Sequence, residues 1–250
     1  MKIFRSESLV DYSTYTFNYA TYCIQDKPEE LTDIYDKGFL PYSNQLDLRV
    51  QAYYLARSLR VELDRFNQSS ENRRVLKNLT DMNPDFKVHS IHDFNLKDPS
   101  FLNYCLNFSK ERFSEPLSEE RLSYILNWPS LTHVIEFFLD GRKVGYVLGI
   151  MNEQTFHYWF AFFDLDNPSL SLGKWMMYSA IEFAAEQDLK YVYLGTCYGE
   201  KSLYKVRDFK GLAYFDGNEW SSDMKQLKTK CKTDALPKAD LFKTATDTFL

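Results

Sequence analysis

The stretch DNPSLSLGKWMMYSAIEFAAEQDLKYVYLG, residues 166–195, passes from a polar loop into a helix and then into a strand. Gly173 stands where the loop becomes helical, and an apolar side that includes Met176, Met177 and Ile181 follows it. The run YVYLG at the end is typical of a buried strand. This succession of loop, helix and strand predicts an α/β arrangement.

Three apolar strands are predicted directly before this stretch, in THVIEFFLDGRKVGYVLGIMNEQTFHYWFAFFD, residues 132–164. Asp140 and Gly141 predict a tight hairpin turn, and the polar residues 152–154 predict a second turn. Because strand follows strand with no helix between them, this part of the sheet should be antiparallel. Together with the helix and strand that follow, the pattern predicts an α/β (α+β) fold with a mixed, largely antiparallel sheet flanked by helices.

A polar segment with two prolines, DMNPDFKVHSIHDFNLKDPS, occupies residues 81–100. We place a domain boundary there, with a smaller N-terminal lobe at 1–85 and a larger domain at 86–250. In the first lobe, a helix is expected to end at Gly38, and either Ser69 or Ser70 is expected to cap a second helix. Apolar residues recur at helical spacing in two segments of the larger domain, 98–113 and 117–129.

The composition excludes several classes of protein. The chain has 250 residues, 44% of them hydrophobic, which is enough for a sizeable core. Its four cysteines form no CxxC pair, so we expect no metal site, no disulfide framework and a reducing, cytoplasmic location. No apolar run approaches the roughly 20 residues of a membrane span or resembles a signal peptide. We therefore expect no membrane partner.

Charge gives a further restriction. The formal net charge of -5 argues against a protein that binds polyanions nonspecifically, because affinity for phosphates depends on many cations. The segment from Arg49 to Asn78 is locally basic, with seven basic and three acidic residues. A specific contact with an anionic partner therefore stays possible in this segment.

Gly173 has two interpretations. The first turn of a helix has backbone N–H groups without partners and a partial positive charge, which suits a phosphate, a carboxylate or a developing oxyanion. A glycine there allows close approach of such a ligand, but it also suits a helix that begins next to a strand. The order of meander, glycine-bearing loop, helix and strand resembles acyl-coenzyme A N-acyltransferases of the GNAT fold. Their usual (Q/R)xxGx(G/A) loop is replaced here by SLSLGK, which has one glycine and no arginine.

A larger set of motifs resembles the arginyl- and leucyl-tRNA–protein transferases, whose C-terminal half is GNAT-like. The matching landmarks occur in the family's order and spacing: Asp164, Asp166, Ser171-Leu172-Gly173, Tyr193-Leu194-Gly195, Tyr204-Lys205 and Trp220. In the first lobe, KGFLPYS (37–43) resembles the family's GFRRSG element. RSLRVELDRFNQSSENRRVLKN (57–78) resembles its arginine-rich stretch. The resemblance covers roughly residues 19 to 220 with gaps.

The sequence also departs from this family. Members generally carry an N-terminal cysteine set, whereas only Cys23 stands near that position here. Leu40 and Pro41 replace the two arginines of the GFRRSG element, which removes two cations. The resemblance is therefore to a divergent member.

The resemblance implies a set of site residues. The loop and helix start at Ser171, Leu172 and Gly173 would bind the donor, together with Tyr193 and Gly195 of the YLG strand. Arg57, Arg60, Arg73 and Arg74 would contact tRNA, although a solvated helix face is the other interpretation of the last two.

Three residues are the candidates for catalysis. Lys205 would meet an anionic group or is simply solvated. Tyr204 would stack, donate a hydrogen bond or only pack in the core. His157 is the candidate base among the histidines.

The function implied is an enzyme that moves arginine or leucine from aminoacyl-tRNA to the α-amine of a protein N-terminus, marking that protein for degradation by the N-end rule. Aminoacyl-tRNA would be a co-substrate, with no resident cofactor. Two alternatives stay open: an N-acyltransferase that uses acetyl-coenzyme A, and a relative that binds tRNA or protein without catalysis. Donor amino acid, acceptor residue and oligomeric state are not determined by the sequence.

Overall fold

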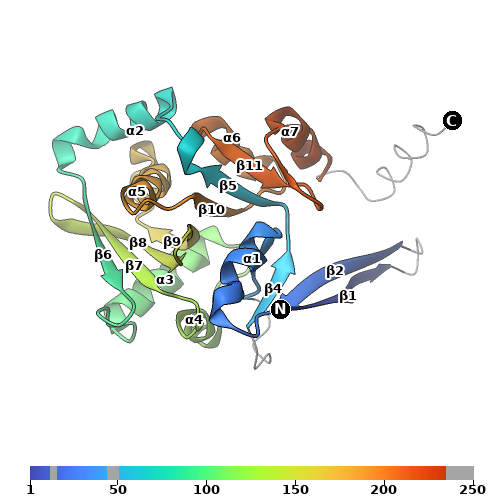
Figure 1. Cartoon of the computed structure of the whole chain (residues 1–250). Coiled ribbons are helices and arrows are strands. Elements are labelled where there is room, and N and C mark those ends of the chain that lie inside the picture. Colours follow the sequence, from blue (N-terminus) through green and yellow to red (C-terminus); the bar gives the residue numbers. More distant parts are fainter. Residues whose placement is uncertain (12–15, 44–50, 235–250) are drawn as a thin grey trace.

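The computed structural model describes residues 1–11, 16–43 and 51–234, which form two sheets and the helices around them (Figure 1). The smaller sheet contains β1 (Lys2–Asp11), β2 (Thr16–Ile24), β3 (Phe39–Pro41) and β4 (Ala52–Leu55). The larger sheet contains β5 (Ser58–Glu62), β6 (Asp85–Ser90), β7 (His133–Leu139), β8 (Arg142–Met151), β9 (Thr155–Phe163), β10 (Tyr191–Thr196), β11 (Leu212–Phe215) and β12 (Trp220–Ser221). The α-helices are α1 (Leu31–Asp36), α2 (Ser70–Leu79), α3 (Pro99–Arg112), α4 (Glu119–Leu126), α5 (Leu172–Glu186), α6 (Tyr204–Asp208) and α7 (Met224–Thr233).

The larger sheet has the strand order β12-β11-β5-β10-β9-β8-β7-β6. Its strands pair antiparallel except at β9 and β10, which run parallel and are connected by α5. The predicted fold class, a mixed and largely antiparallel sheet flanked by helices, is thus confirmed.

The hairpin between β7 and β8 forms for a local reason. Asp140 and Gly141 both have positive φ angles, 49° and 73°. Positive φ at both central residues is what a two-residue type I′ hairpin requires, and aspartate followed by glycine tolerates it best. The predicted turn, and with it the β7–β8–β9 meander, is confirmed.

Two hydrophobic cores lie against the larger sheet. One packs side chains of α2, α5 and α7 against the sheet, and Met176 and Ile181 of α5 are completely buried in it. The other packs α1, α3, α4 and residues of the smaller sheet around Phe101 and Tyr35. Helix α5 is buried on most of its surface because α2 covers the side that faces away from β8 and β9 (Figure 1). The position of α5 fixes where its first turn meets the end of β9.

The predicted domain boundary at residue 85 stays a prediction. The division of the strands between the two sheets does not coincide with it. Strand β5 belongs to the first 85 residues, yet it lies between β10 and β11 in the larger sheet. Residues 81–100 are polar because they form the edge strand β6 and exposed turns around it. An edge strand can expose one face and one edge to solvent, so many of its side chains are polar. Its composition therefore resembles that of a linker.

No helix in the described ranges is both long enough and apolar enough to cross a membrane.

Helix α2 begins at a cap that the sequence left open between two serines. Ser69 Oγ accepts a hydrogen bond from the Asn72 amide at 3.0 Å, and Asn72 Oδ1 accepts one from the Ser69 amide at 2.9 Å. The same hydroxyl donates to the carbonyl of Asp208 at 2.7 Å. Ser69 is therefore the N-cap, and it also fixes α2 to the end of α6.

Replacement of Ser69 by alanine should lower the free energy of unfolding by about 1–2 kcal/mol, because it removes the cap and leaves the buried Asp208 carbonyl without this donor. Urea unfolding followed by circular dichroism measures the change. Ser70→Ala is the matched control, since Ser70 is exposed and should change stability by less than about 0.5 kcal/mol. Equal effects of the two substitutions would contradict the assignment of the cap.

Candidate active site

The parallel strands β9 and β10 separate partway along their length. They pair only where Thr155, Phe156 and His157 face Tyr191, Val192 and Tyr193. Beyond that point β9 continues to Phe163 along β8, and β10 continues to Thr196 along β5. We call the place where the two strands diverge, in the middle of the larger sheet, the notch.

Lys205 lies at the end of β10 that borders this notch. Its Nζ atom donates hydrogen bonds to the carbonyls of Leu194 at 2.6 Å and Thr196 at 3.1 Å. Between these residues, Gly195 has a φ of 78°, and the register with β5 shifts across it. A glycine adopts this left-handed conformation without the steric cost of a Cβ atom, which allows the bulge. Beyond Tyr193, β10 has no pairing with β9, and the bulge and the hydrogen bonds from Lys205 stabilise this end of the strand.

Burial brings the pKa of Lys205 closer to neutral pH. Removal from solvent lowers the pKa of this ammonium to about 8, opposed by the neighbouring Cys197. At neutral pH the side chain is still mostly protonated. Its two carbonyl bonds use two of the three N–H groups, so one donor remains for a group bound in the notch. Lys205 therefore provides a positive charge with a pKa close to the working pH.

A pocket of about 720 Å³ lies at the C-terminal end of β9. We call it the α5 pocket, because the first turn of α5 forms one wall and the last turn of α3 forms another. Its lining residues come from these helices, from β9 and from α6, and they are Phe108, Glu111, Arg112, Phe113, Tyr158, Ala161, Phe163, Asp164, Leu165, Asn167, Pro168, Ser171, Leu172, Gly173, Lys174, Met177 and Tyr204.

Residues of the first turn of α5 line this pocket. Ser171 precedes the helix with a φ of 55°, and Leu172 and Gly173 are its first two residues. The amides of first-turn residues have no acceptor within their own helix. A Cβ atom on Gly173 would lie 2.8 Å from the ring of Phe163, which lines the same pocket. The glycine therefore has a packing role, and its predicted role in ligand binding stays a prediction.

An ion-pair network lies at the rim of the α5 pocket. Lys174 Nζ lies 2.6 Å from a Glu71 oxygen and 3.0 Å from an Asp208 oxygen. Arg74 binds Glu71 through two hydrogen bonds of 2.8 Å, and Arg207 binds the fully buried Asp208 at 2.6 Å. Hydrogen bonds from Arg74 and then Lys174 hold the pKa of Glu71 at about 2. Two carboxylates thus share these three cations.

A second pocket, of about 300 Å³, lies on the opposite side of β9. We call it the aromatic pocket after its composition: Leu40, Pro41, Tyr42, Ser43, Tyr54, His157, Trp159, Phe160, Gly195 and Thr196 line it. Successive side chains of a strand point to opposite faces of the sheet. His157 accordingly lines the aromatic pocket, whereas Tyr158 lines the α5 pocket. The two pockets flank one notch, with Lys205 beside it.

The surroundings of His157 do not suit a general base. Its Nδ1 atom lies 2.9 Å from the hydroxyl of Tyr35, and its ring is buried. Burial, and to a lesser extent the charge of Lys205, lowers the pKa of His157 to about 3. An imidazole with so low a pKa is neutral and takes up protons weakly at neutral pH. His157 therefore contributes shape and hydrogen bonding to the pocket.

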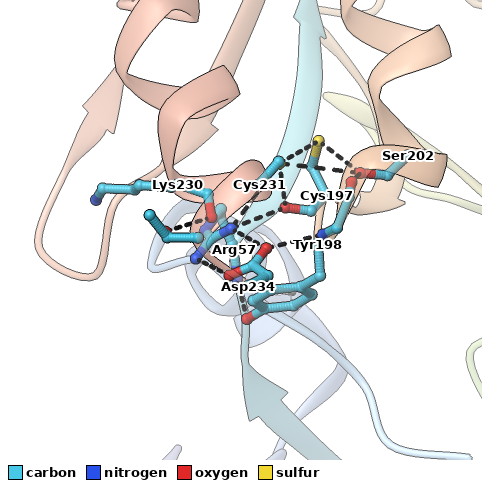
Figure 2. Close-up of polar contacts among 9 residues, drawn as sticks. Arg57, Cys197, Tyr198, Ser202, Lys230, Cys231 and Asp234 are labelled. Atoms are coloured by element: carbon cyan, nitrogen blue, oxygen red, sulfur yellow. Dashed lines mark hydrogen bonds and ion pairs between the residues drawn. The ribbon is translucent and has the colours of Figure 1, made fainter. Parts of the chain in front are cut away.

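Arg57 lines neither pocket, and Figure 2 shows it beside Cys197 and Asp234. It binds the Asp234 carboxylate through hydrogen bonds of 2.8 and 3.1 Å and donates to the Cys197 carbonyl at 3.3 Å. The ring of Tyr198 lies 4.7 Å from its guanidinium carbon. The sulfur atoms of Cys197 and Cys231 lie 3.8 Å apart beside this cluster. Arg57 thus fixes the end of α7 to the segment that follows β10.

Arg60 is engaged in the same manner. It is 6% exposed and lies between the rings of Tyr191 and Trp220, at 3.8 and 4.0 Å from the two ring centres. Its guanidinium pairs with Asp36 at 3.3 Å and Glu62 at 3.2 Å. A tRNA phosphate could bind Arg60 only after these contacts were broken.

The predicted site residues therefore fall into four groups. Those that line the α5 pocket are Ser171, Leu172, Gly173 and Tyr204, while His157 and Gly195 line the aromatic pocket and Lys205 borders the notch. Outside both linings lie Arg57, Arg60, Arg73, Arg74 and Tyr193. Tyr193 is completely buried and packs its ring 4.7 Å from that of Tyr35.

Several pocket residues escaped the sequence analysis. Lys174 directly follows Gly173, so its place in the first turn of the helix was a usable signal. Tyr42, Tyr54 and Trp159 had no such signal, because they come from three separate segments that only the fold brings together. Within the described ranges, no group of three or more histidine, cysteine, aspartate or glutamate side chains has an arrangement that could hold a metal ion.

Comparison with known proteins supports the type of domain. Residues 106–210 match the family described as Acetyltransferase (GNAT) domain. The matched span includes β9, α5, β10 and Lys205, so the chain contains a GNAT-like domain with the notch at its centre. The span is less than half of the chain. A comparison with curated proteins finds no match.

Some solved structures are similar at low identity. The C-terminal domain (DUF2156) of a putative lysylphosphatidylglycerol synthetase from Agrobacterium fabrum is 16% identical, with a TM-score of 0.44, and the alignment covers 85% of this chain and 71% of that chain. L-PGS from Bacillus licheniformis is 13% identical, with a TM-score of 0.43 and coverage of 84% and 71%. FemX is 10% identical, with a TM-score of 0.46 and coverage of 86% and 67%. We draw no functional conclusion from likenesses of this size.

The ammonium of Lys205 should titrate with a midpoint near pH 8, because burial disfavours its charged form. Selective ¹³C labelling of the lysines, with the resonance assigned through Lys205→Arg, allows the titration to be followed by NMR. Exposed Lys201, labelled in the same sample, is the internal reference resonance. A midpoint for Lys205 above about 10 would show that the ammonium is well solvated.

Proposed function

We propose that this chain is an aminoacyltransferase that moves an amino acid, arginine or leucine, from aminoacyl-tRNA to the α-amine of a protein N-terminus. The observation that carries the proposal is the notch between β9 and β10, which has the ammonium of Lys205 at its side and a pocket on each face of the sheet. This arrangement would let a donor approach from one face and an amine from the other.

The chemistry is the conversion of an ester into an amide. The amine nitrogen forms a bond to the ester carbonyl carbon, and the bond from that carbon to the ribose oxygen breaks. One proton leaves the amine, and one proton arrives on the ribose oxygen. An α-amine has a pKa of about 7.7–8.0, so a useful fraction is already neutral at pH 7. Positioning of the two reactants can therefore supply much of the acceleration.

Lys205 would act on the charge that develops during this reaction. Its remaining N–H group can donate to the oxyanion of the tetrahedral intermediate. Its pKa of about 8 also lies close to that of the attacking amine, so the side chain can give a proton to the departing ribose oxygen and take up the proton that leaves the amine. The carbonyls of Leu194 and Thr196 hold it in place for both roles.

The α5 pocket is the proposed site for the donor end of tRNA. Its volume of about 720 Å³ lies in the range of pockets that enclose small ligands, and so suits a terminal nucleoside with its amino acid. First-turn amides of α5, next to Ser171, offer donors to a phosphate or carbonyl oxygen. The SLG motif and Tyr204 of the YK motif line this pocket, and Lys205 binds the Leu194 carbonyl of the YLG motif at the notch. No resident cofactor is needed in this scheme, and marking of proteins for degradation would follow from it.

A second candidate function is transfer of an acyl group from coenzyme A. The match of residues 106–210 to an acetyltransferase domain favours it. The loop before α5 disfavours it, because SLSLGK has one glycine and no arginine where acyl-coenzyme A N-acyltransferases usually have (Q/R)xxGx(G/A). Such a loop offers fewer close backbone contacts to a pyrophosphate.

A transfer assay distinguishes the two candidates. The purified chain is incubated with a model peptide and either ¹⁴C-arginyl-tRNA, ¹⁴C-leucyl-tRNA or ¹⁴C-acetyl-coenzyme A, and label in the peptide is measured. We expect label from at least one aminoacyl-tRNA and none from acetyl-coenzyme A. Label from acetyl-coenzyme A alone would establish the second candidate, and no label from any donor would favour a non-catalytic binding protein.

Lysine variants provide the control for this assay. Lys205→Met should lower the transfer rate by about 100-fold, the usual cost of removing one donor to an oxyanion. Lys205→Arg keeps the positive charge and should retain part of the activity. Lys201→Met, an exposed lysine four residues earlier, should leave the rate unchanged. Full activity of Lys205→Met would exclude the catalytic role of this side chain.

A further inference from the structure

The composition of the aromatic pocket restricts what can bind in it. Four of its side chains are rings, those of Tyr42, Tyr54, Trp159 and Phe160, and Leu40 and Pro41 add aliphatic surface. Among the described residues that line the pocket, none carries a formal charge, because His157 is held neutral by its low pKa. Such a surface gains free energy by covering an apolar group and offers no ion pair to a carboxylate.

Lys205 does not change this conclusion. Its Nζ atom is already bonded to the carbonyls of Leu194 and Thr196, and both carbonyl oxygens carry partial negative charge. The ring faces of Tyr42 and Trp159 are also negative because of the aromatic quadrupole. A carboxylate that entered the pocket to reach Lys205 would lose its water beside these groups. Loss of hydration is unfavourable for an ion, Lys205 is not among the residues that line the pocket, and in the proposed reaction its remaining N–H group donates to the oxyanion.

From the aromatic pocket, a row of rings runs outward across the smaller sheet. Tyr54 meets Tyr42 with their ring centres 5.8 Å apart, Tyr42 meets Tyr22 at 5.3 Å, and Tyr22 stacks on Phe4 at 5.5 Å. Phe4 is 43% exposed at the outer end of this row. Apolar surface therefore continues from the pocket toward solvent along β4, β2 and β1. A ligand with more than one apolar group could lie along it.

We infer that the aromatic pocket is the acceptor site and that it selects a primary amine carried on an aromatic or branched aliphatic group, such as a peptide that begins with phenylalanine or leucine. Peptides that begin with aspartate or glutamate are poor acceptors on this account. The inference rests on the proposed function for its statement that the bound amine is the acceptor. The preference of the pocket for apolar amines rests on its walls alone.

Binding of three small amines tests this inference directly. Isothermal titration calorimetry on the full chain compares phenylalanine amide, leucine amide and aspartic acid α-amide at pH 8. We expect the first two to bind at least 10-fold more tightly than the third. Equal affinity, tighter binding of aspartic acid α-amide, or no binding of phenylalanine amide would each overturn the inference.

Variants locate the binding in the pocket. Tyr54→Ala should weaken phenylalanine amide by at least 10-fold, because Tyr54 lines the pocket. Tyr22→Ala is the matched control, because Tyr22 belongs to the same row of rings but does not line the pocket. This variant should bind phenylalanine amide with the same affinity as the original chain. Equal loss in both variants, with both folded by circular dichroism, would contradict the location.

A second variant covers the case in which Tyr54→Ala fails to fold. Ser43 lines the pocket and is only partly buried, so Ser43→Arg should fold and place a cation at the wall. Aspartic acid α-amide should then bind at least 10-fold more tightly than to the original chain. An unchanged affinity would show that the charge of this pocket does not determine selection.

The outcomes separate this inference from the proposed function. Selective binding of phenylalanine amide without transfer from any aminoacyl-tRNA would leave the pocket assignment intact and reject the proposed reaction. Transfer from aminoacyl-tRNA to peptides that begin with aspartate, and not to those that begin with phenylalanine, would support the proposed reaction and reject the pocket assignment.

Discussion

The contact between the Lys205 ammonium and the carbonyls of Leu194 and Thr196 is the interaction on which the site depends. When β10 separates from β9, its backbone loses the partner strand on that side, and buried carbonyl groups without donors are costly. Lys205 supplies the missing donors at 2.6 and 3.1 Å. Without it, the two strands would have to pair further or admit water, and the notch would close or fill. The same burial lowers the lysine's pKa to about 8, which is the property the proposed chemistry uses.

The two faces of the notch have different chemistry. Rings line both pockets, but charged side chains, among them Arg112, Asp164 and Lys174, line the α5 pocket, whereas no described residue that lines the aromatic pocket carries a formal charge. Because β9 alternates its side chains between these faces, one strand contributes to both environments. This difference in charge is the basis on which we assign the donor to the α5 pocket and the acceptor to the aromatic pocket.

The elements that could be predicted from sequence are those with local causes. The hairpin at Asp140 and Gly141, the helix after Gly173 and the strand YVYLG each follow from turn chemistry or hydrophobic period, and the structure has all three. The place of β5 between β10 and β11, by contrast, follows from pairing over more than a hundred residues of sequence separation. No local pattern encodes such a pairing.

The candidate site shows the same division. Gly173, Tyr204 and Lys205 could be selected because motif spacing places them near a helix start and a strand end. Arg57 and Arg60 were assigned to tRNA by resemblance, whereas long-range partners, Asp234 for one and Asp36 with two rings for the other, hold them in the structure. The aromatic pocket was missed since its walls come from β3, β4, β9 and β10 and the residues beside them.

The central claim is that one acyl donor spans the α5 pocket and reaches Lys205 in the notch. A crystal structure with a stable analogue, adenosine carrying leucine through a 3′-amide, tests it most directly. The account predicts the adenosine in the α5 pocket and the amide carbonyl oxygen about 3 Å from Lys205 Nζ, within hydrogen-bond distance. An analogue bound with its carbonyl away from the notch, or adenosine seated in the aromatic pocket, would contradict it.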